Sequence, residues 1–461
     1  MEQAWLPDLI FVDGRFQSEV AIVCDSSGRI SRIGPAHEIT EAKRLKGRAL
    51  LPGLINAHSH AFQRVIRGRT EYRSQHSNDS FWTWRELMYA AANRLEVEDI
   101  YDASRMAFME MALAGITAVG EFHYLHKAPG GTLYTDPNLL AKEVIRAAND
   151  VGLRIAMLRV AYERAGFQKG PNPLQQRFIE TSDDYLTNLQ SLVSQVNGKS
   201  ELAWTGAAPH SVRAVSLDYL KTVASFTSQH ELPLHMHVAE QPGEVEACIE
   251  EYGRSPVALL DTEGILNERF TAVHAIHVTP QEIAALAQHR ANVCACPTTE
   301  RNLGDGVIPT DGYLAAGVPI SLGSDSQIQI DLLEDARELE YELRLQRQER
   351  NVLAPEVADG PAGLAYRLFE CATINGARSL GVDAGRLEAG STPDFFTVDL
   401  NDPSIAGAST NDLLASILFS LSRTAIREVV VGGKTIISEG RHPDQGRITE
   451  RFNALQAKLW N

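Results

Sequence analysis

Two histidines separated by one residue, His58 and His60, are the residues of this chain best suited to bind a metal. They end an apolar run that opens after Pro52-Gly53 and is typical of a β-strand. Side chains two residues apart on a strand point to the same side, so both imidazoles can contact one ion. Such a pair is weak evidence by itself, because histidines recur by chance. The interpretation therefore depends on residues further along the chain.

Further polar residues follow other apolar runs: His237 and Glu240, then His274, then Asp325. A metal held by three imidazoles and one carboxylate from this group keeps one coordination position free for water. Such an open position is typical of catalytic zinc sites rather than structural ones. Taken singly, His274 is also compatible with a core histidine and Asp325 with a helix cap. Their joint occurrence at the ends of four predicted strands favours a metal site.

The chemistry of such a site is hydrolytic. Water bound to a divalent ion loses its proton near neutral pH and becomes a nucleophile. Glu240 lies three residues beyond His237 and is placed to carry a proton from this water to a leaving nitrogen. Asp325 can bind the metal and also hold the attacking water. We therefore predict catalytic roles for Glu240 and Asp325.

Eight apolar, strand-like runs alternate with helical patterns such as residues 99–114 and 138–151. This alternation predicts a (β/α)₈ TIM barrel, whose chemistry lies at the C-terminal ends of the strands. An open doubly wound sheet is disfavoured, because no glycine-rich phosphate loop opens a helix and the candidate ligands follow many strands. The runs span residues 53–57, 116–122, 153–161, 202–208, 232–238, 270–276, 291–297 and 319–322.

The two ends of the chain have a different sequence pattern. Short strand-like pieces broken by turn residues occupy residues 9–12 and 20–23, and similar pieces return at residues 395–399 and 427–437. We therefore predict an α/β protein with the barrel at residues 51–383. A smaller β-sandwich domain is expected from residues 1–50 and 384–461, followed by a C-terminal helix.

The composition of the chain limits its possible binding partners and its cellular compartment. The chain has 461 residues, 22% of them charged, and a net charge of −16. This charge would repel nucleic acid and anionic membranes. No apolar run reaches the roughly 18 residues of a membrane span, and the N-terminus lacks the features of a signal peptide. Five cysteines are too few for a disulfide framework, and Cys294 and Cys296 are interpreted as strand residues. We expect a cytoplasmic protein.

Several motifs together resemble the amidohydrolase superfamily, in its cytosine deaminase and chlorohydrolase branch. The resemblance covers nearly the whole chain and includes residues 52–60, 237–240, 323–325, 373–378 and 385–390. It implies that His58, His60, His237 and Asp325 bind one metal and that His274 contacts substrate or water. Binuclear relatives need a lysine on the fourth strand, and residues 202–208 contain none. We expect a single divalent ion, Zn²⁺ in preference to iron or manganese.

Within this branch the chain resembles the N-formimino-L-glutamate deiminases of histidine breakdown. The motifs are Gln63, residues 82–85, 121–124 and 207–213, and they imply substrate contacts from Gln63, Tyr124, His210 and Arg213. Arginine binds carboxylates with two parallel hydrogen bonds, so Arg213 and Arg85 suit the two carboxylates of a glutamate tail. Arg85 is equally compatible with a solvated helix position. The resemblance also implies a homodimer.

Three functions remain open from the sequence. The preferred one is hydrolysis of a formimino group to a formyl group on a small dianionic substrate, with loss of ammonia. The second keeps the metal chemistry but acts on a purine, pyrimidine or triazine ring, as a deaminase or chlorohydrolase. The third is a non-catalytic barrel that serves in assembly. Such proteins usually lose metal ligands, and none of the expected set is missing.

Overall fold

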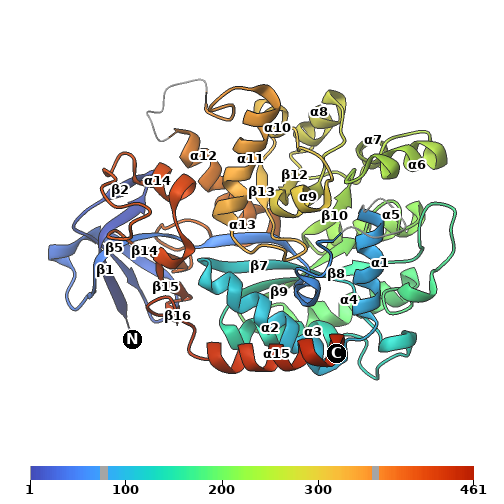
Figure 1. The fold of residues 1–461 in the computed structure, drawn as a ribbon, viewed down its shortest axis with the longest axis horizontal. Helices are drawn as coiled ribbons and strands as arrows, with labels where there is room; N and C mark the ends of the chain where they lie inside the picture. The colour runs from blue at the N-terminus through green and yellow to red at the C-terminus, as the bar shows by residue number, and fades with distance from the viewer. Residues whose placement is uncertain (1, 73–80, 356–362) are drawn as a thin grey trace.

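Eight parallel strands form a barrel in the computed structural model, which describes residues 2–72, 81–355 and 363–461 (Figure 1). Each strand pairs with the next one along the chain, as in a (β/α)₈ barrel. The predicted barrel is confirmed. Its strands are β6 (Leu54–Ser59), β7 (Ile116–His123), β8 (Arg154–Ala161), β9 (Ala203–Pro209), β10 (Leu234–Val238), β11 (Phe270–His274), β12 (Asn292–Ala295) and β13 (Ile320–Leu322).

The barrel strands are buried along almost their whole length; every residue of β7, β8, β10 and β11 is buried. Strands covered on both faces read as continuous apolar runs, which is why they could be located from the sequence. Cys294 and Cys296 lie in this interior beside Ala57 and Val273, as expected for strand residues.

The first and last strands meet at the C-terminal rim. Ser59 and Asp325 form an isolated parallel bridge. The backbone N–H of Asp325 donates to the carbonyl of His58 (3.1 Å), and the N–H of His60 donates to the carbonyl of Asp325 (3.0 Å). This pair of bonds links β6 to the segment after β13, so the sheet curls into a barrel instead of remaining open.

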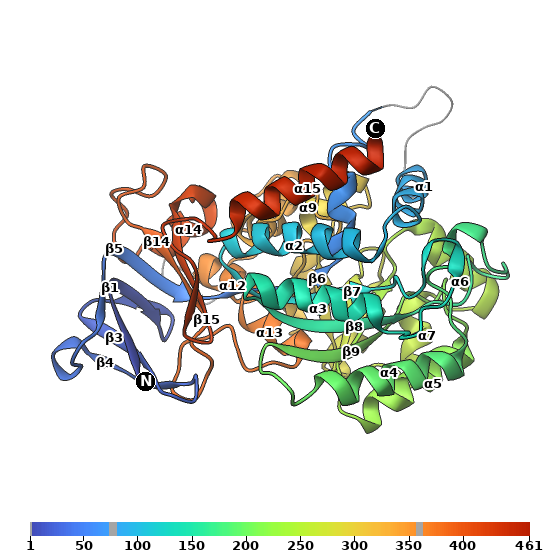
Figure 2. The ribbon, with the colours of Figure 1, turned by 90° about the horizontal axis from the view of Figure 1, so that it is seen from below.

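Helices surround the barrel, and α13 lies against its N-terminal end (Figures 1 and 2). Trp204 donates to the carbonyl of Leu380, and His235 lies 2.8 Å from the carbonyl of Ser379. The helices are α1 (Phe81–Ala92), α2 (Val97–Leu113), α3 (Leu139–Val151), α4 (Ser182–Val196), α5 (Leu217–Gln229), α6 (Pro242–Tyr252), α7 (Pro256–Thr262), α8 (Pro280–Gln288), α9 (Pro297–Leu303), α10 (Thr310–Ala315), α11 (Leu332–Arg347), α12 (Gly363–Cys371), α13 (Ile374–Leu380), α14 (Leu413–Ser420) and α15 (Gln445–Trp460).

Shorter 3₁₀ turns are η1 (Ala36–Glu38), η2 (Ala61–Ile66), η3 (Pro129–Gly131), η4 (Pro173–Gln175) and η5 (Arg423–Ala425). The C-terminal helix α15 lies along α2 on the outside of the barrel (Figure 2). Arg105 and Asp444 form an ion pair at this contact (2.7 Å). Across the described ranges, no helix combines the length and apolar character needed to cross a membrane.

A second, mixed sheet combines strands from both ends of the chain, as predicted. Strand β5 pairs with β1 in parallel and with β14 in antiparallel orientation, which joins the N-terminal strands to the C-terminal ones. Its members are β1 (Gln3–Val12), β2 (Arg15–Gln17), β3 (Val20–Cys24), β4 (Ile30–Pro35), β5 (Lys43–Pro52), β14 (Phe395–Asp399), β15 (Ile426–Val431) and β16 (Lys434–Ile437). The exact domain limits, 51–383 for the barrel, stay a prediction.

A buried ion pair joins the two sheets. Arg154, at the start of β8, donates to both carboxylate oxygens of Asp394, just before β14 (2.6 and 3.2 Å). Asp394 also accepts from the backbone N–H of Gly432 at 2.6 Å. Both charged side chains are almost completely buried.

Asp394→Asn is expected to lower the free energy of unfolding by about 3–5 kcal/mol, because it leaves the buried Arg154 without its counter-charge. Denaturant-induced unfolding followed by circular dichroism measures the change. The control is Asp383→Asn, which removes an exposed partner of Arg386 and should cost less than about 1 kcal/mol. Equal effects of the two substitutions would contradict a structural role for the buried pair.

Candidate metal centre and substrate cavity

Four side chains predicted as metal ligands meet at the C-terminal rim of the barrel. His58 and His60 come from the end of β6, His237 from β10, and Asp325 from the segment after β13. The Nε2 atom of His237 lies 3.2 Å from that of His58 and 3.4 Å from that of His60. Asp325 Oδ1 lies 3.5 and 3.3 Å from the same two nitrogens. The four ligand atoms therefore surround one small space.

The hydrogen bonds behind the rings show why a cation fits there. His60 Nδ1 donates to the carbonyl of Phe122 (2.9 Å), and His237 Nδ1 donates to that of His210 (3.0 Å). A neutral imidazole that donates from Nδ1 has a lone pair on Nε2. The Nε2 lone pairs of His60 and His237 thus face each other, and a metal ion between them removes their repulsion. Carbonyl acceptors behind the ring are the usual support for histidine ligands.

Burial keeps these histidines neutral, as metal binding requires. It lowers the pKa of His58 to about 3 and lowers the pKa values of His60 and His237 as well. Burial alone would raise the pKa of Asp325, but the hydrogen bond from His58 and the nearby His60 and His274 hold it below its usual range. The cluster therefore consists of three neutral imidazoles and one carboxylate.

His274 and Glu240 lie beside this cluster, on the side that opens to the cavity. His274 Nε2 is 3.8 Å from Glu240 Oε1 and 3.7 Å from Asp325 Oδ2. Burial alone would lower the pKa of His274, but Glu240, Glu300 and Asp325 raise it well above its ordinary value. Burial raises the pKa of Glu240. A cationic hydrogen-bond donor and a carboxyl group able to hold a proton thus face the same reaction space.

The cavity above the cluster is lined by all five residues predicted to contact substrate: Gln63, Arg85, Tyr124, His210 and Arg213. Gln63 Nε2 donates to the hydroxyl of Tyr124 (3.0 Å), while its Oε1 is buried without a partner among the described residues. The backbone of His210 supports His237, and its ring lies 4.7 Å, centroid to centroid, from that of Tyr162. These contacts fix one wall of the cavity.

Two arginines also line the cavity. Arg213 is only 5% exposed, and its Nη1, like that of Arg85, has no hydrogen-bond partner in the described part of the chain. The Trp82 ring lies 4.6 Å from the guanidinium of Arg85 and 5.4 Å from that of Arg213. Cation–π contacts therefore hold both groups without neutralising them. Arg85 faces the cavity, so the alternative of a purely solvated position does not hold in this structure.

Several polar residues at the site received no role from the sequence. Glu121 supports the β6 end by accepting from Ser59 Oγ (2.6 Å) and from the N–H of Ala61 (2.7 Å). Burial raises its pKa to about 8. Glu300, on α9, lies 3.1 Å from His274 Nδ1. A sequence signal existed for Glu300: it follows the seventh apolar run, at the rim where the other functional residues lie.

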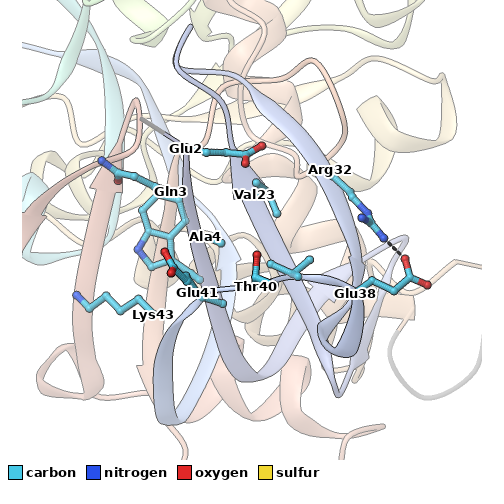
Figure 3. Close-up of a pocket in the computed structure, with 12 residues that line it drawn as sticks. Glu2, Gln3, Ala4, Val23, Arg32, Glu38, Thr40, Glu41 and Lys43 are labelled. Carbon is cyan, nitrogen blue, oxygen red and sulfur yellow. Dashed lines mark hydrogen bonds and ion pairs between the residues drawn. The ribbon is translucent and has the colours of Figure 1, made fainter.

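A larger hollow of about 700 Å³ lies in the terminal sheet and contains none of the predicted site residues (Figure 3). Figure 3 shows side chains from β1, β4 and the segment before β5 around it, with Arg32 paired to Glu38. Both partners of this pair are about half exposed, so their charges are screened by water. Size alone therefore does not identify the functional site.

The sequence pattern of the amidohydrolase family matches residues 49–436. Formimidoylglutamate deiminase of Pseudomonas aeruginosa is 38% identical over 99% of this chain and 98% of its own length. A 5-methylthioadenosine/S-adenosylhomocysteine deaminase of Moorella thermoacetica is 30% identical over 85% of this chain and 82% of its own. The crystal structure of an amidohydrolase from Brucella melitensis superposes with a TM-score of 0.91 at 31% identity, and the match covers both chains completely.

This chain therefore belongs to the amidohydrolase family. Membership confirms the resemblance drawn from its motifs. It also identifies the chain as a hydrolytic enzyme of a metal-dependent family, with the His58, His60, His237 and Asp325 cluster as its candidate metal site.

His237→Ala is expected to remove bound metal and activity together while the fold is retained, because barrel stability resides in side-chain layers below the rim. Elemental analysis and circular dichroism measure the two quantities. The matched control is His235→Gln on the same strand, which faces the carbonyl of Ser379 and should leave the metal in place. Full metal content in the His237 variant would remove this residue from the ligand set.

Proposed function

We propose that this member of the amidohydrolase family hydrolyses N-formimino-L-glutamate to N-formyl-L-glutamate and ammonia. The observation that carries the proposal is the pair of guanidinium groups in the wall of the cavity, Arg85 and Arg213, each with a buried Nη1 that has no hydrogen-bond partner among the described residues. A buried N–H donor without an acceptor is costly, so the pair is best explained by an anion that arrives with the substrate. The 38% identical deiminase of P. aeruginosa supports the same substrate.

Groups of opposite charge line the cavity. The arginines share it with Glu240 and Asp325, whose carboxylates lie 3.8 and 3.7 Å from His274 Nε2. A formimino group is an amidine, a strong base that carries positive charge near neutral pH. N-formimino-L-glutamate therefore has a cationic head for the carboxylates and two anionic groups for the arginines. Charge complementarity along the cavity supports this orientation.

The principal alternative is a ring deaminase, and the M. thermoacetica relative acts on a nucleoside. Tyr89, Tyr124 and Tyr162 line the cavity and offer aromatic surface. A purine or pyrimidine base, however, carries no carboxylate for Arg85 and Arg213, so the buried Nη1 atoms of both guanidinium groups would remain without an acceptor. The linear amidine thus accounts for more of the site than a ring does.

In this proposal, side chains of the protein carry out the proton transfers. When bound, a divalent metal supplies the Lewis acidity that makes water nucleophilic near neutral pH. Glu240 takes a proton from the water as its oxygen bonds to the amidine carbon, and delivers a proton to the terminal nitrogen. The bond from carbon to this nitrogen then breaks as Asp325 takes the remaining proton from the oxygen, and ammonia leaves as the formyl carbonyl forms. His274 donates a hydrogen bond to the tetrahedral intermediate from Nε2.

We further propose one zinc ion per chain, because β9 carries no lysine that could bridge a second metal. We expect a homodimer, and a place for the reaction in histidine breakdown. Elemental analysis of active enzyme distinguishes one equivalent of metal from two. Two equivalents would contradict the mononuclear site without affecting the substrate assignment.

Glu240→Gln should keep its metal but lose about 10²–10⁴-fold in kcat, because an amide cannot accept the proton of water. Steady-state rates with elemental analysis provide the measurement. Glu244→Gln, a buried neighbour that accepts from the backbone N–H of Glu240, is the comparison and should lose much less. A near-normal kcat for Glu240→Gln at full metal content would assign the proton transfer to another residue.

Arg213→Ala should cost roughly 2–5 kcal/mol in kcat/KM for formimino-glutamate, the scale for one partner of a desolvated charge pair. The penalty should shrink for an analogue that lacks the carboxylate bound by Arg213, since that contact is already absent. Ammonia release from formimino-amino acids, guanidino acids and nucleobases provides the rates. Equal penalties for both substrates, or faster turnover of a nucleobase, would show that the proposed substrate is wrong.

A further inference from the structure

We propose that Glu300 is a positioning residue for the reaction: it accepts the Nδ1 proton of His274 and so fixes the orientation of that ring, with Nε2 directed toward the reacting group. The proposal rests on the hydrolytic function but not on formimino-glutamate as substrate.

The contact between the two side chains is direct. Glu300 Oε1 lies 3.1 Å from His274 Nδ1, and the opposite ring nitrogen, Nε2, faces Glu240 and Asp325. Glu300 has no exposed surface and His274 is 1% exposed, so water does not compete for this hydrogen bond. A carboxylate that accepts from one ring nitrogen fixes the ring orientation, so the other nitrogen stays directed toward the reaction space.

Glu300 is itself held in place. The backbone N–H of Cys296 donates to the same Oε1 (2.9 Å), which fixes the carboxylate at the first turn of α9. In the same turn Thr299 Oγ1 accepts from the N–H of Ser326 (3.2 Å), next to Asp325. Helix α9 therefore braces both the electrophilic histidine and the segment that carries a metal ligand.

A second metal between His274, Cys296 and Glu300 is the competing interpretation, since their ligand atoms lie within 4.8 Å of one another. Two observations disfavour it. Glu300 Oε1 already accepts the hydrogen bond from Cys296 N–H, and His274 Nδ1 is within hydrogen-bond distance of that oxygen.

The test compares single and double variants. Glu300→Leu removes the acceptor and should lower kcat roughly 10–100-fold with bound metal unchanged and KM altered much less. Glu300→Gln keeps one acceptor oxygen and should recover part of the rate. In a His274→Gln background, Glu300→Leu should add no more than about a twofold loss, because the ring through which it acts is gone.

The control is Glu282→Gln, a buried carboxylate in the capping box of α8, which should affect unfolding but not kcat. The rates are measured on whichever substrate the panel shows to be turned over, so an error in the substrate leaves the test valid. An equal loss from Glu300→Leu with and without His274 would overturn the proposal. So would metal loss parallel to the rate, or a fall in kcat of the same size in the Glu282 variant.

Discussion

The two backbone hydrogen bonds between β6 and the segment after β13 are the constraint on which the site depends. They bring His58, His60 and Asp325 together in the same step that closes the barrel. Gly323 permits this approach, because a Cβ at that position would lie 2.7 Å from the Cβ of His58. Three of the four candidate ligands are therefore fixed by the fold itself. Only His237 has to be added, and it comes from β10, with its ring held by the carbonyl of His210.

Backbone geometry at the other strand ends directs the remaining groups. Ala239, His274 and Asp325 have positive φ angles of 51°, 68° and 43° in a region that favours glycine. Conformations of this kind cost on the order of 1–3 kcal/mol each and persist where surrounding structure imposes them. Two of the three residues are functional candidates. Strand pairing below the rim therefore stabilises backbone conformations at the rim that are unfavourable by themselves. The left-handed turn at His274 lets the ring reach Glu300 with one nitrogen while the other faces the cavity.

The barrel and the cluster of candidate ligands could be predicted from the sequence for one physical reason. Parallel strands buried on both faces are continuous apolar runs, and a polar residue that ends such a run stands out. His58, His60, His237 and Asp325 all satisfy this rule. Glu300 escaped because it lies four residues into the next helix, where a glutamate is ordinary. The position of Arg85 was left open between a substrate contact and a solvated site, because sequence does not show which face of α1 turns toward the barrel.

Arginines in the wall of the cavity explain how a chain of net charge −16 can accept the proposed substrate with its two carboxylates. The protein's overall field repels such a molecule, so binding needs local cations shielded from the acidic surface. Arg213 meets this need because it is almost fully buried, and Trp82 contacts both guanidiniums while leaving their charge unneutralised. Burial also raises the pKa of Glu240, which lines the same cavity. Exclusion of water thus serves both recognition by the arginines and proton transfer by Glu240.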